Sequence, residues 1–204
     1  MRIAVYGGPG RVGSRIVAEA LTRDHWVTSI SRTLSGDIPD HARPRIGDAA
    51  DGDDVAKVAS EHDVVVSAMG PSRTGGRPQT FVQAIETLAA NVGTRRLVVV
   101  GQGGGLEVAP GLRLLDTVAY PADLRPEALV HLDVLQALRD AGGLVDWLYF
   151  APAPSMTDGP RMGRYRLGLD SAIGDAISLD DYALAVADEL ETPHHRRVRL
   201  HAAY

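Results

Sequence analysis

The chain of 204 residues contains no cysteine, a single lysine and no long hydrophobic run. The absence of cysteine excludes disulfides, thiolate catalysis and cysteine metal sites. No apolar run approaches the roughly 20 residues that a membrane helix needs, so we expect no membrane span. The apolar start Ile3–Tyr6 is too short for the core of a signal peptide and runs directly into glycines, which predicts a cytoplasmic protein.

Basic residues are not gathered into a surface for nucleic acid. The formal net charge is −5, and the one basic run is the short stretch His194–Arg199. This pattern predicts no nucleic-acid partner. His194 and His195 are followed by Arg196 and Arg197, and we expect no metal site there. Hydrophobic residues make up 45% of the chain and charged residues 23%, which is ordinary for one globular domain with its own core.

Apolar runs of strand length alternate with helical patterns along the whole chain. The predicted strands are Arg2–Tyr6, Trp26–Ile30, Arg45–Ile46, Asp63–Ala68, Arg96–Val100, Asp146–Phe150 and Val198–Ala203. The predicted helices are Val12–Leu21, one capped by Asp53 and reaching Ser60, one capped by Thr80 and reaching Asn91, Pro126–Ala141, and one from the capping box Ser178–Asp181 to Glu191. This alternation predicts an α/β fold with a doubly wound parallel sheet of Rossmann type, as one domain over residues 1–204 with a small C-terminal extension on the substrate side.

Three segments rich in glycine and proline each follow a predicted strand directly. They are Gly70–Pro78, Gly101–Gly111 and Ala151–Gly163. In a doubly wound sheet such segments form the loops at the carboxyl ends of the strands, where ligands bind. The other interpretation is that they are surface loops without a ligand.

The first predicted strand runs into the glycine turn Gly7–Gly13. Gly7 allows a tight turn, Gly10 allows the backbone to approach a pyrophosphate, and Gly13 allows the helix and the strand to pack closely. The amino end of the following helix supplies unpaired N–H groups and a positive dipole to phosphates. We therefore predict a dinucleotide site; the alternative is a structural glycine turn. The predicted cofactor residues are Gly7, Pro9, Gly10, Arg11, Val12, Gly13, Ser31, Arg32, Asp48, Ala68, Met69, Gly70 and Pro152.

The end of the second predicted strand carries no carboxylate for a ribose 2′-hydroxyl. Ser31 and Arg32 stand there instead, and a guanidinium suits a 2′-phosphate. Arg11 is a candidate for a second cation at that phosphate. NADP(H) is therefore favoured over NAD(H), unless Arg32 is a solvated surface side chain. Asp48 either receives the adenine amino group or caps the turn that it opens.

Several stretches resemble the atypical short-chain dehydrogenase/reductases. The resemblance is carried by Gly7–Gly13, Ser31-Arg32, Gly47-Asp48, Val64–Gly70, Arg95–Gly101, Leu106–Gly111, Pro126–Ala128 and Tyr165–Gly168. It is closest to the bacterial NAD(P)H-binding proteins of the NADH-flavin reductase group, with biliverdin reductase B and the NmrA-like proteins as more distant relatives. The resemblance covers nearly the whole chain and implies the fold and a nicotinamide cofactor.

The chain departs from that group at three places. Gly8-Pro9 replaces the usual Ala-Thr of the glycine turn, and proline offers no N–H to a phosphate. Biliverdin reductase B has a serine after the fifth strand and a histidine after the sixth, whereas this chain has Gln102–Gly104 and Pro152–Pro154 there. A helical histidine of biliverdin reductase B has its counterpart at His131.

Ordinary short-chain dehydrogenases use a catalytic tyrosine with a lysine four residues later. This pair is missing here, because the residue four positions before the single lysine, Lys57, is Asp53. Hydride transfer to a conjugated acceptor does not need such a catalytic acid, since the proton for the reduced acceptor can come from solvent. We predict His131 as a proton donor near neutral pH and Gln102 as a donor to the acceptor, or else as packed and bracing side chains. The predicted substrate residues are Tyr120, Phe150 and Tyr165, whose alternative is a place in the core or on the surface.

The sequence therefore predicts an NADPH-dependent reductase of a flavin, quinone or similar planar acceptor. One alternative is an NADP(H)-binding sensor without turnover, as among the NmrA-like proteins. Another is a biosynthetic enzyme acting on an aromatic or polyketide-like intermediate. We expect a small-molecule substrate and a monomer or homodimer.

Overall fold

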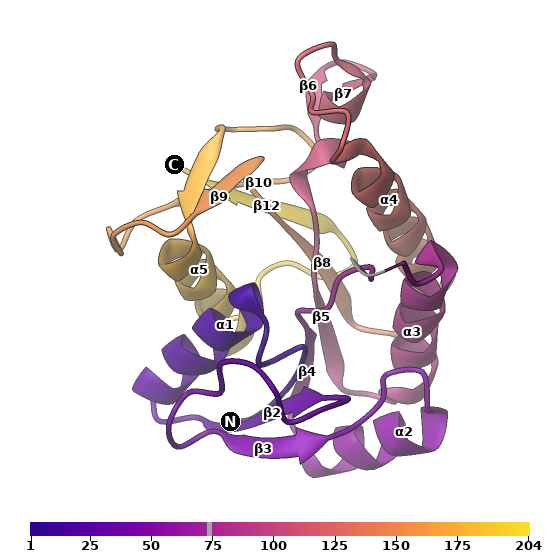
Figure 1. Cartoon of the computed structure of the whole chain (residues 1–204), viewed down its shortest axis with the longest axis vertical. Helices are drawn as coiled ribbons and strands as arrows, with labels where there is room; N and C mark the ends of the chain where they lie inside the picture. Colours follow the sequence, from indigo (N-terminus) through magenta and orange to yellow (C-terminus); the bar gives the residue numbers. More distant parts are fainter. Residues whose placement is uncertain (73–74) are drawn as a thin grey trace.

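The computed structural model describes residues 1–72 and 75–204, and its core is an eight-stranded sheet in the order β10-β12-β8-β5-β4-β1-β2-β3 (Figure 1). The neighbouring strands are parallel, except that β10 runs antiparallel to β12. The order reverses between β1 and β4, which is the switch point where doubly wound sheets bind ligands. The strands are β1 Arg2–Tyr6, β2 Trp26–Ser31, β3 Arg43–Ile46, β4 Val64–Ser67, β5 Arg96–Val100, β8 Trp147–Pro152, β10 Arg166–Gly168 and β12 Arg199–Ala203.

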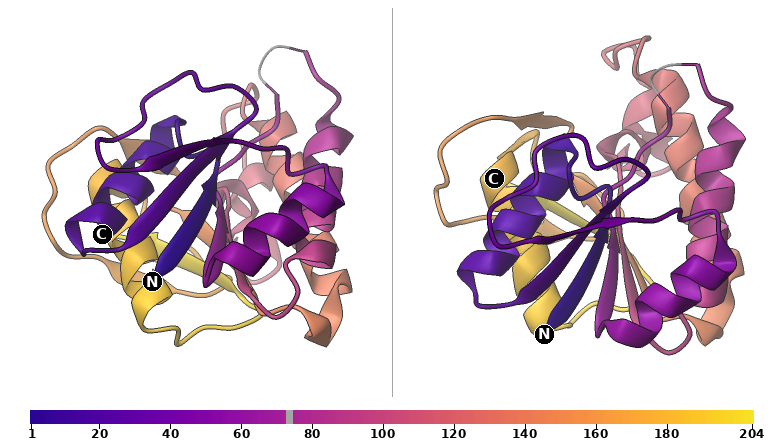
Figure 2. Two further views of the ribbon diagram at one scale, coloured as in Figure 1. Left: turned by 90° about the horizontal axis from the view of Figure 1, so that it is seen from below. Right: turned by 60° about the horizontal axis from the view of Figure 1, so that its bottom comes forward.

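Helices cover both faces of this sheet (Figure 2). One face carries α1 Arg11–Thr22 and α5 Leu179–Glu191, and the other carries α2 Gly52–Glu61, α3 Pro78–Asn91 and α4 Arg125–Asp140. The alternation of side chains along each strand feeds two separate hydrophobic clusters, one under each helical layer. The predicted α/β fold of Rossmann type is confirmed.

The seven strands and five helices predicted from the sequence are present, and two of the predicted helix starts are wrong. Asp51 caps α2 instead of Asp53, because its carboxylate accepts the N–H groups of Asp53 and Asp54. The helix α3 begins at Pro78 rather than after Thr80, since proline suits the first turn, where no N–H donor is needed.

Short strands also occur in the segments predicted as carboxyl-end loops and in the residues that follow them. The first pair is β6 Glu107–Ala109 with β7 Leu112–Arg113, which forms the hairpin at the top of Figure 1. The second pair is β9 Ser155–Thr157 with β11 Ala176–Ser178, and together with β10 it builds the extension between β8 and α5. Residues 73–74 of the segment Gly70–Pro78 lie outside the described residues.

None of the helices in the described ranges has the length and apolar character that crossing a bilayer requires.

Candidate functional site

The glycine turn between β1 and α1 has the geometry that a phosphate cradle needs. Gly7 has a φ of 75°, and a Cβ on it would lie 2.8 Å from the carbonyl oxygen of Ala68. A Cβ on Gly13 would lie 2.1 Å from the carbonyl oxygen of Gly7, so α1 can pack on the turn only with glycine there. No side chain caps α1, whose N-cap is Gly10. The first N–H groups of the helix therefore remain available to an anion.

A cavity of about 530 Å³ opens in front of this turn. Its walls come from the glycine turn, the end of β2, the loop after β3, the end of β4 and the start of α3. Nine of the predicted cofactor residues line it: Gly7, Pro9, Gly10, Ser31, Arg32, Asp48, Ala68, Met69 and Gly70. The lining combines the backbone of the glycine turn with polar side chains such as Arg32 and apolar side chains such as Met69, which is the combination that a diphosphate nucleotide needs.

The loop after β2 folds back over the glycine turn. The N–H of Asp37 donates to the carbonyl oxygen of Pro9 at 3.2 Å, and a Cβ on Gly36 would touch the Pro9 ring at 2.8 Å. Pro9 thus offers no N–H to a phosphate but anchors the loop that carries Arg32. Arg32 is exposed at the cavity and forms no ion pair with any described residue.

Residues with hydroxyl groups stand next to Arg32 in this loop. The Ser31 hydroxyl donates to the carbonyl oxygen of Thr33, and the Thr33 and Ser35 hydroxyls lie 2.7 Å apart. All three residues line the cavity. A guanidinium among hydroxyl groups is a suitable setting for a dianionic phosphate.

Four predicted cofactor residues, Arg11, Val12, Gly13 and Pro152, are not among the residues that line the cavity. The Arg11 guanidinium turns away from the Arg32 end, and its Nη2 lies 3.3 Å from the carbonyl oxygen of Met156 and 3.4 Å from Asp158 Oδ2. Arg11 is therefore not a second cation beside Arg32 in this structure. Val12 and Gly13 stand in the first turn of α1, where their backbone N–H groups, and not their side chains, are available to an anion. Pro152 is buried at the end of β8.

Asp48 has the turn-capping role that the sequence left open. Its Oδ1 accepts the N–H of Ala50 at 3.0 Å. No described residue donates to its second oxygen, and Asp48 lines the cavity. Turn capping by one oxygen therefore leaves the other for a ligand amino group.

His131 is a packed side chain on α4. It is 4% exposed, and its ring centroid lies 5.2 Å from that of Phe81 and 6.4 Å from that of Tyr149. Burial lowers the pKa of His131 to about 4 because the charged ring loses its hydration. The prediction of a proton donor near neutral pH is therefore wrong for this state, since the ring is neutral there.

Gln102 and Tyr120 hold each other within the loop after β5. The Gln102 Oε1 accepts the N–H of Gly104 at 2.6 Å, and its Nε2 donates to the Tyr120 hydroxyl at 2.5 Å. Tyr120 is 7% exposed, and burial raises the pKa of its hydroxyl. The structure thus shows Gln102 bracing the loop, and Tyr120 is not presented to a substrate.

Phe150 and Tyr165 lie on the face of the sheet that α1 and α5 cover, away from the cavity. Phe150 is fully buried against Tyr182. The Tyr165 hydroxyl donates to Asp188 of α5 at 2.5 Å. Successive residues of β8 point to opposite faces, so Tyr149 faces the α4 side and Phe150 does not. Neither predicted substrate residue reaches the cofactor cavity.

Phe81, Thr80 and Tyr6 line the cavity and were missed by sequence reasoning. Phe81 and Thr80 stand in the first turn of α3, directly after the glycine-rich segment that follows β4. The sequence feature that could have indicated Thr80 and Phe81 is this position at the start of the helix that follows β4. Tyr6 is the last residue of β1, and the apolar run that it ends indicated a plain core strand.

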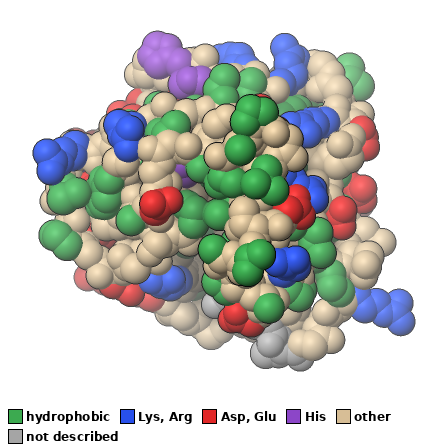
Figure 3. Space-filling model, turned by 90° about the horizontal axis from the view of Figure 1, so that it is seen from above, with side chains coloured by type: hydrophobic (Ala, Val, Ile, Leu, Met, Phe, Trp, Pro, Cys, Tyr) green, Lys and Arg blue, Asp and Glu red, His purple; other side chains and the backbone are tan. Residues whose placement is uncertain are grey.

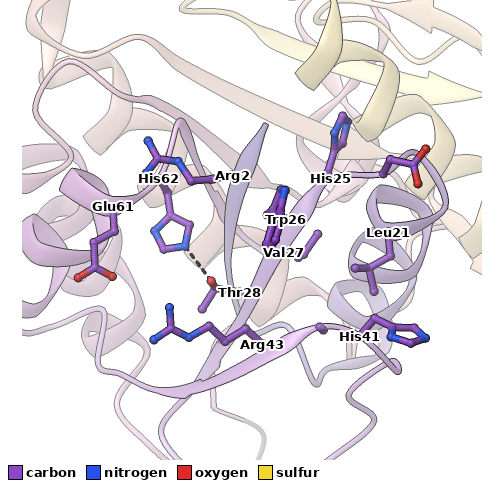
Figure 4. Close-up of a pocket in the computed structure, with 12 residues that line it drawn as sticks. Arg2, Leu21, His25, Trp26, Val27, Thr28, His41, Arg43, Glu61 and His62 are labelled. Carbon is purple, nitrogen blue, oxygen red and sulfur yellow. Dashed lines mark hydrogen bonds between the residues drawn. The ribbon is translucent and has the colours of Figure 1, made fainter.

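A second cavity of about 750 Å³ lies at the opposite edge of the sheet, where β1 and β2 begin (Figure 4). Thr28 Oγ1 and His62 Nε2 are 2.8 Å apart in it, and His62 Nδ1 lies 2.7 Å from the carbonyl oxygen of Val58. Both ring nitrogens of His62 are thus engaged within the protein. Since doubly wound sheets bind nucleotides at the carboxyl ends of their strands, the smaller cavity is the candidate cofactor site.

Comparison with known proteins agrees with this geometry. The model of the NAD(P)H-binding family matches residues 7–193. YwnB of Bacillus subtilis, a protein without an assigned function, is 34% identical over 215 residues, which cover 98% of this chain and 96% of that protein. A solved structure from Burkholderia pseudomallei, of a protein provisionally named as exported, is 37% identical with a TM-score of 0.89 and covers 100% of both chains. Another from Streptococcus pneumoniae, of a protein provisionally named an NADH-flavin reductase, is 29% identical with a TM-score of 0.86 and covers 99% of this chain and 98% of that chain.

Proposed function

Because the chain belongs to the NAD(P)H-binding family, we propose that it is an NADPH-dependent reductase of a flavin, quinone or similar planar conjugated acceptor. The observation that carries the proposal is the glycine cradle with Arg32 at one end of the same cavity. The flavin-reductase name of the similar Streptococcus pneumoniae protein supports the class of acceptor.

Different residues of the cavity bind different parts of the cofactor. The first turn of α1 binds the diphosphate through backbone N–H groups, and Ser31 with Arg32 binds the 2′-phosphate. Met69 and Phe81 form an apolar wall that excludes water at the other end. The nicotinamide supplies a hydride when it is bound. His131 is neutral behind that wall, so we expect solvent to deliver the proton.

Hydrophobic side chains also lie outside the cavity on the face seen from above (Figure 3). The β6–β7 hairpin contributes Val108 and Leu112, which are 45% and 42% exposed. This hairpin follows the carboxyl end of β5, on the edge of the sheet where the acceptor would approach. An apolar approach suits a planar conjugated molecule better than a small polar one.

The test of this function is the oxidation of NADPH, followed by its loss of absorbance with riboflavin, FMN and menadione as acceptors. We expect loss that depends on one of these acceptors. If NADPH binds but its absorbance does not fall with any of these acceptors, an NADP(H)-binding sensor without turnover is favoured. The hydrogen bonds that already engage the side chains of Gln102 and Tyr120 also suit such a sensor. Calorimetry that detects neither NADPH nor NADH binding would refute both functions.

The choice of NADPH rests on Arg32. We expect Arg32→Ala to weaken NADPH binding about 30-fold, because charge-assisted hydrogen bonds contribute about 2 kcal/mol. NADH binding should change less than threefold, since it carries no 2′-phosphate. Isothermal titration of both nucleotides measures this. Arg43→Ala is the matched control, because Arg43 is also exposed but lines the cavity at the other edge. Equal losses of NADPH and NADH affinity in Arg32→Ala would contradict the assignment.

A further inference from the structure

The loop Gly47–Ala50 lines the same cavity as Arg32, and one carboxylate holds it in place. Asp54, in the first turn of α2, accepts the N–H of Asp48 at 3.1 Å through Oδ2. Its Oδ1 lies 2.5 Å from Nη2 of Arg45 on β3. A single side chain thus connects the loop, the helix and the strand.

The loop lies directly on this carboxylate. A Cβ on Gly47 would come within 2.8 Å of Asp54 Oδ2 and within 2.8 Å of Ile30 Cγ2. The N–H of Gly47 donates to the carbonyl oxygen of Ser31 at 3.1 Å, which ties the loop to the end of β2. The position of the loop is therefore set jointly by Asp54 and by the strand that carries Arg32.

The ion pair is shielded from solvent. The side chains of Arg45 and Asp54 are 19% and 21% exposed. Tyr6, which is 1% exposed, lies in register beside Ile30, which in turn lies beside Arg45. Burial first and then the charge of Asp54 raise the pKa of Tyr6, so this hydroxyl stays neutral. Screening by water is weak in such a place, so the pair holds its geometry more firmly than an exposed pair would.

The Tyr6 hydroxyl is buried, and no described residue accepts or donates a hydrogen bond there. Its ring forms part of the cavity wall under Ala49. The loop above it presents the second oxygen of Asp48 to the cavity. The contacts that hold the loop are therefore those of Asp54 with the Asp48 N–H and with Arg45.

We propose that Asp54, paired with Arg45, is a positioning residue that holds Gly47–Ala50 in place for the base of the adenine nucleotide. This inference rests on the proposed function, because that function puts an adenine nucleotide in the cavity. The pair differs from Arg32 in the part of the ligand that it affects, since it acts on the base through Asp48 and not on the 2′-phosphate.

The test uses the full chain with Asp54→Asn and, as a matched control, Asp53→Asn, whose exposed side chain accepts no hydrogen bond from a described residue. Adenosine 2′,5′-bisphosphate is titrated by calorimetry, and hydrogen–deuterium exchange is followed in the free protein. We expect Asp54→Asn to weaken the bisphosphate about 10-fold and to speed exchange of the segment 47–50. Exchange in the glycine turn should not change, and Asp53→Asn should behave as the unaltered chain does.

Several outcomes would overturn the inference. Bisphosphate affinity of Asp54→Asn within twofold of the unaltered chain would do so, and so would faster exchange spread equally over the glycine turn. Should Asp54→Asn fail to fold, Arg45→Gln replaces it, with a loss of about threefold expected and no loss overturning the proposal. If the unaltered chain binds no adenine nucleotide, the proposed function fails, while the exchange of residues 47–50 still decides whether Asp54 positions the loop.

Discussion

Replacing Gly10 by serine is expected to weaken NADPH binding at least 30-fold while the melting temperature stays within about 2 °C. Gly10 has a φ of −76° and a ψ of 168°, which any residue adopts, so the backbone does not need glycine here. A Cβ on it would meet one atom within 4 Å, the carbonyl oxygen of Gly7 at 3.0 Å. The added side chain needs a shift of a few tenths of an ångström at this one contact, and it enters the space of the diphosphate. Its hydroxyl would also cap α1 and so compete for the N–H groups that the phosphates need.

Gly13→Ala is the contrasting variant for this prediction. Its Cβ would lie 2.1 Å from the carbonyl oxygen of Gly7, so the turn must move and both stability and binding should fall. Thermal unfolding and NADPH titration of the two variants separate a glycine needed for the ligand from one needed for packing. NADPH affinity of Gly10→Ser within threefold of the unaltered chain would show that the diphosphate does not bind at α1.

Nine of the predicted cofactor residues line one cavity because local chemistry determines where they stand. The glycine turn, Ser31-Arg32 and Asp48 each follow a strand, and parallel strands bring their carboxyl ends to one edge. The substrate end was predicted poorly. Choosing Phe150 over Tyr149 required the facing of β8, and a fully buried strand shows no alternation in its sequence. Arg11 was placed at the wrong end because its partner, Asp158, is distant in sequence.

The short strands were also beyond sequence reasoning. The strands β6, β7, β9, β10 and β11 have two or three residues each, too few for a periodic pattern. Their pairing depends on long-range neighbours, as in β10, which lies against β12 about 35 residues later. The polar side chains of Gln102 and His131 were predicted as catalytic because a sequence does not reveal that Gln102 hydrogen-bonds within its own loop or that His131 packs between aromatic rings.

A buried ionic cluster connects the end of α5, the segment between α5 and β12, and the start of β5. It lies at the edge of the sheet opposite the cofactor cavity. Glu189, which is 4% exposed, lies 2.8 Å from Nη2 of Arg96 and 2.8 Å from Nδ1 of His195. It also accepts the backbone N–H of His195 at 2.9 Å. Arg96 is 8% exposed, and its Nη2 also donates to the carbonyl oxygen of His195. The Glu189 carboxylate therefore fixes the segment that leads from α5 to β12, and its negative charge compensates the buried positive charge of Arg96.

Glu189→Ala is expected to lower the free energy of unfolding by about 3–5 kcal/mol, because it leaves Arg96 buried without its nearest carboxylate. The Arg96–Asp146 distance of 3.7 Å is too long to replace the lost bond. Urea unfolding measures the change, and Glu191→Ala, which breaks a more exposed pair with Arg23, should cost about 1 kcal/mol or less. NADPH affinity of the folded fraction should not change, since the cluster lies at the other edge of the sheet. A loss below about 1 kcal/mol would show that Arg96 is hydrated, and that packing of α5 rather than charge fixes this end of the fold.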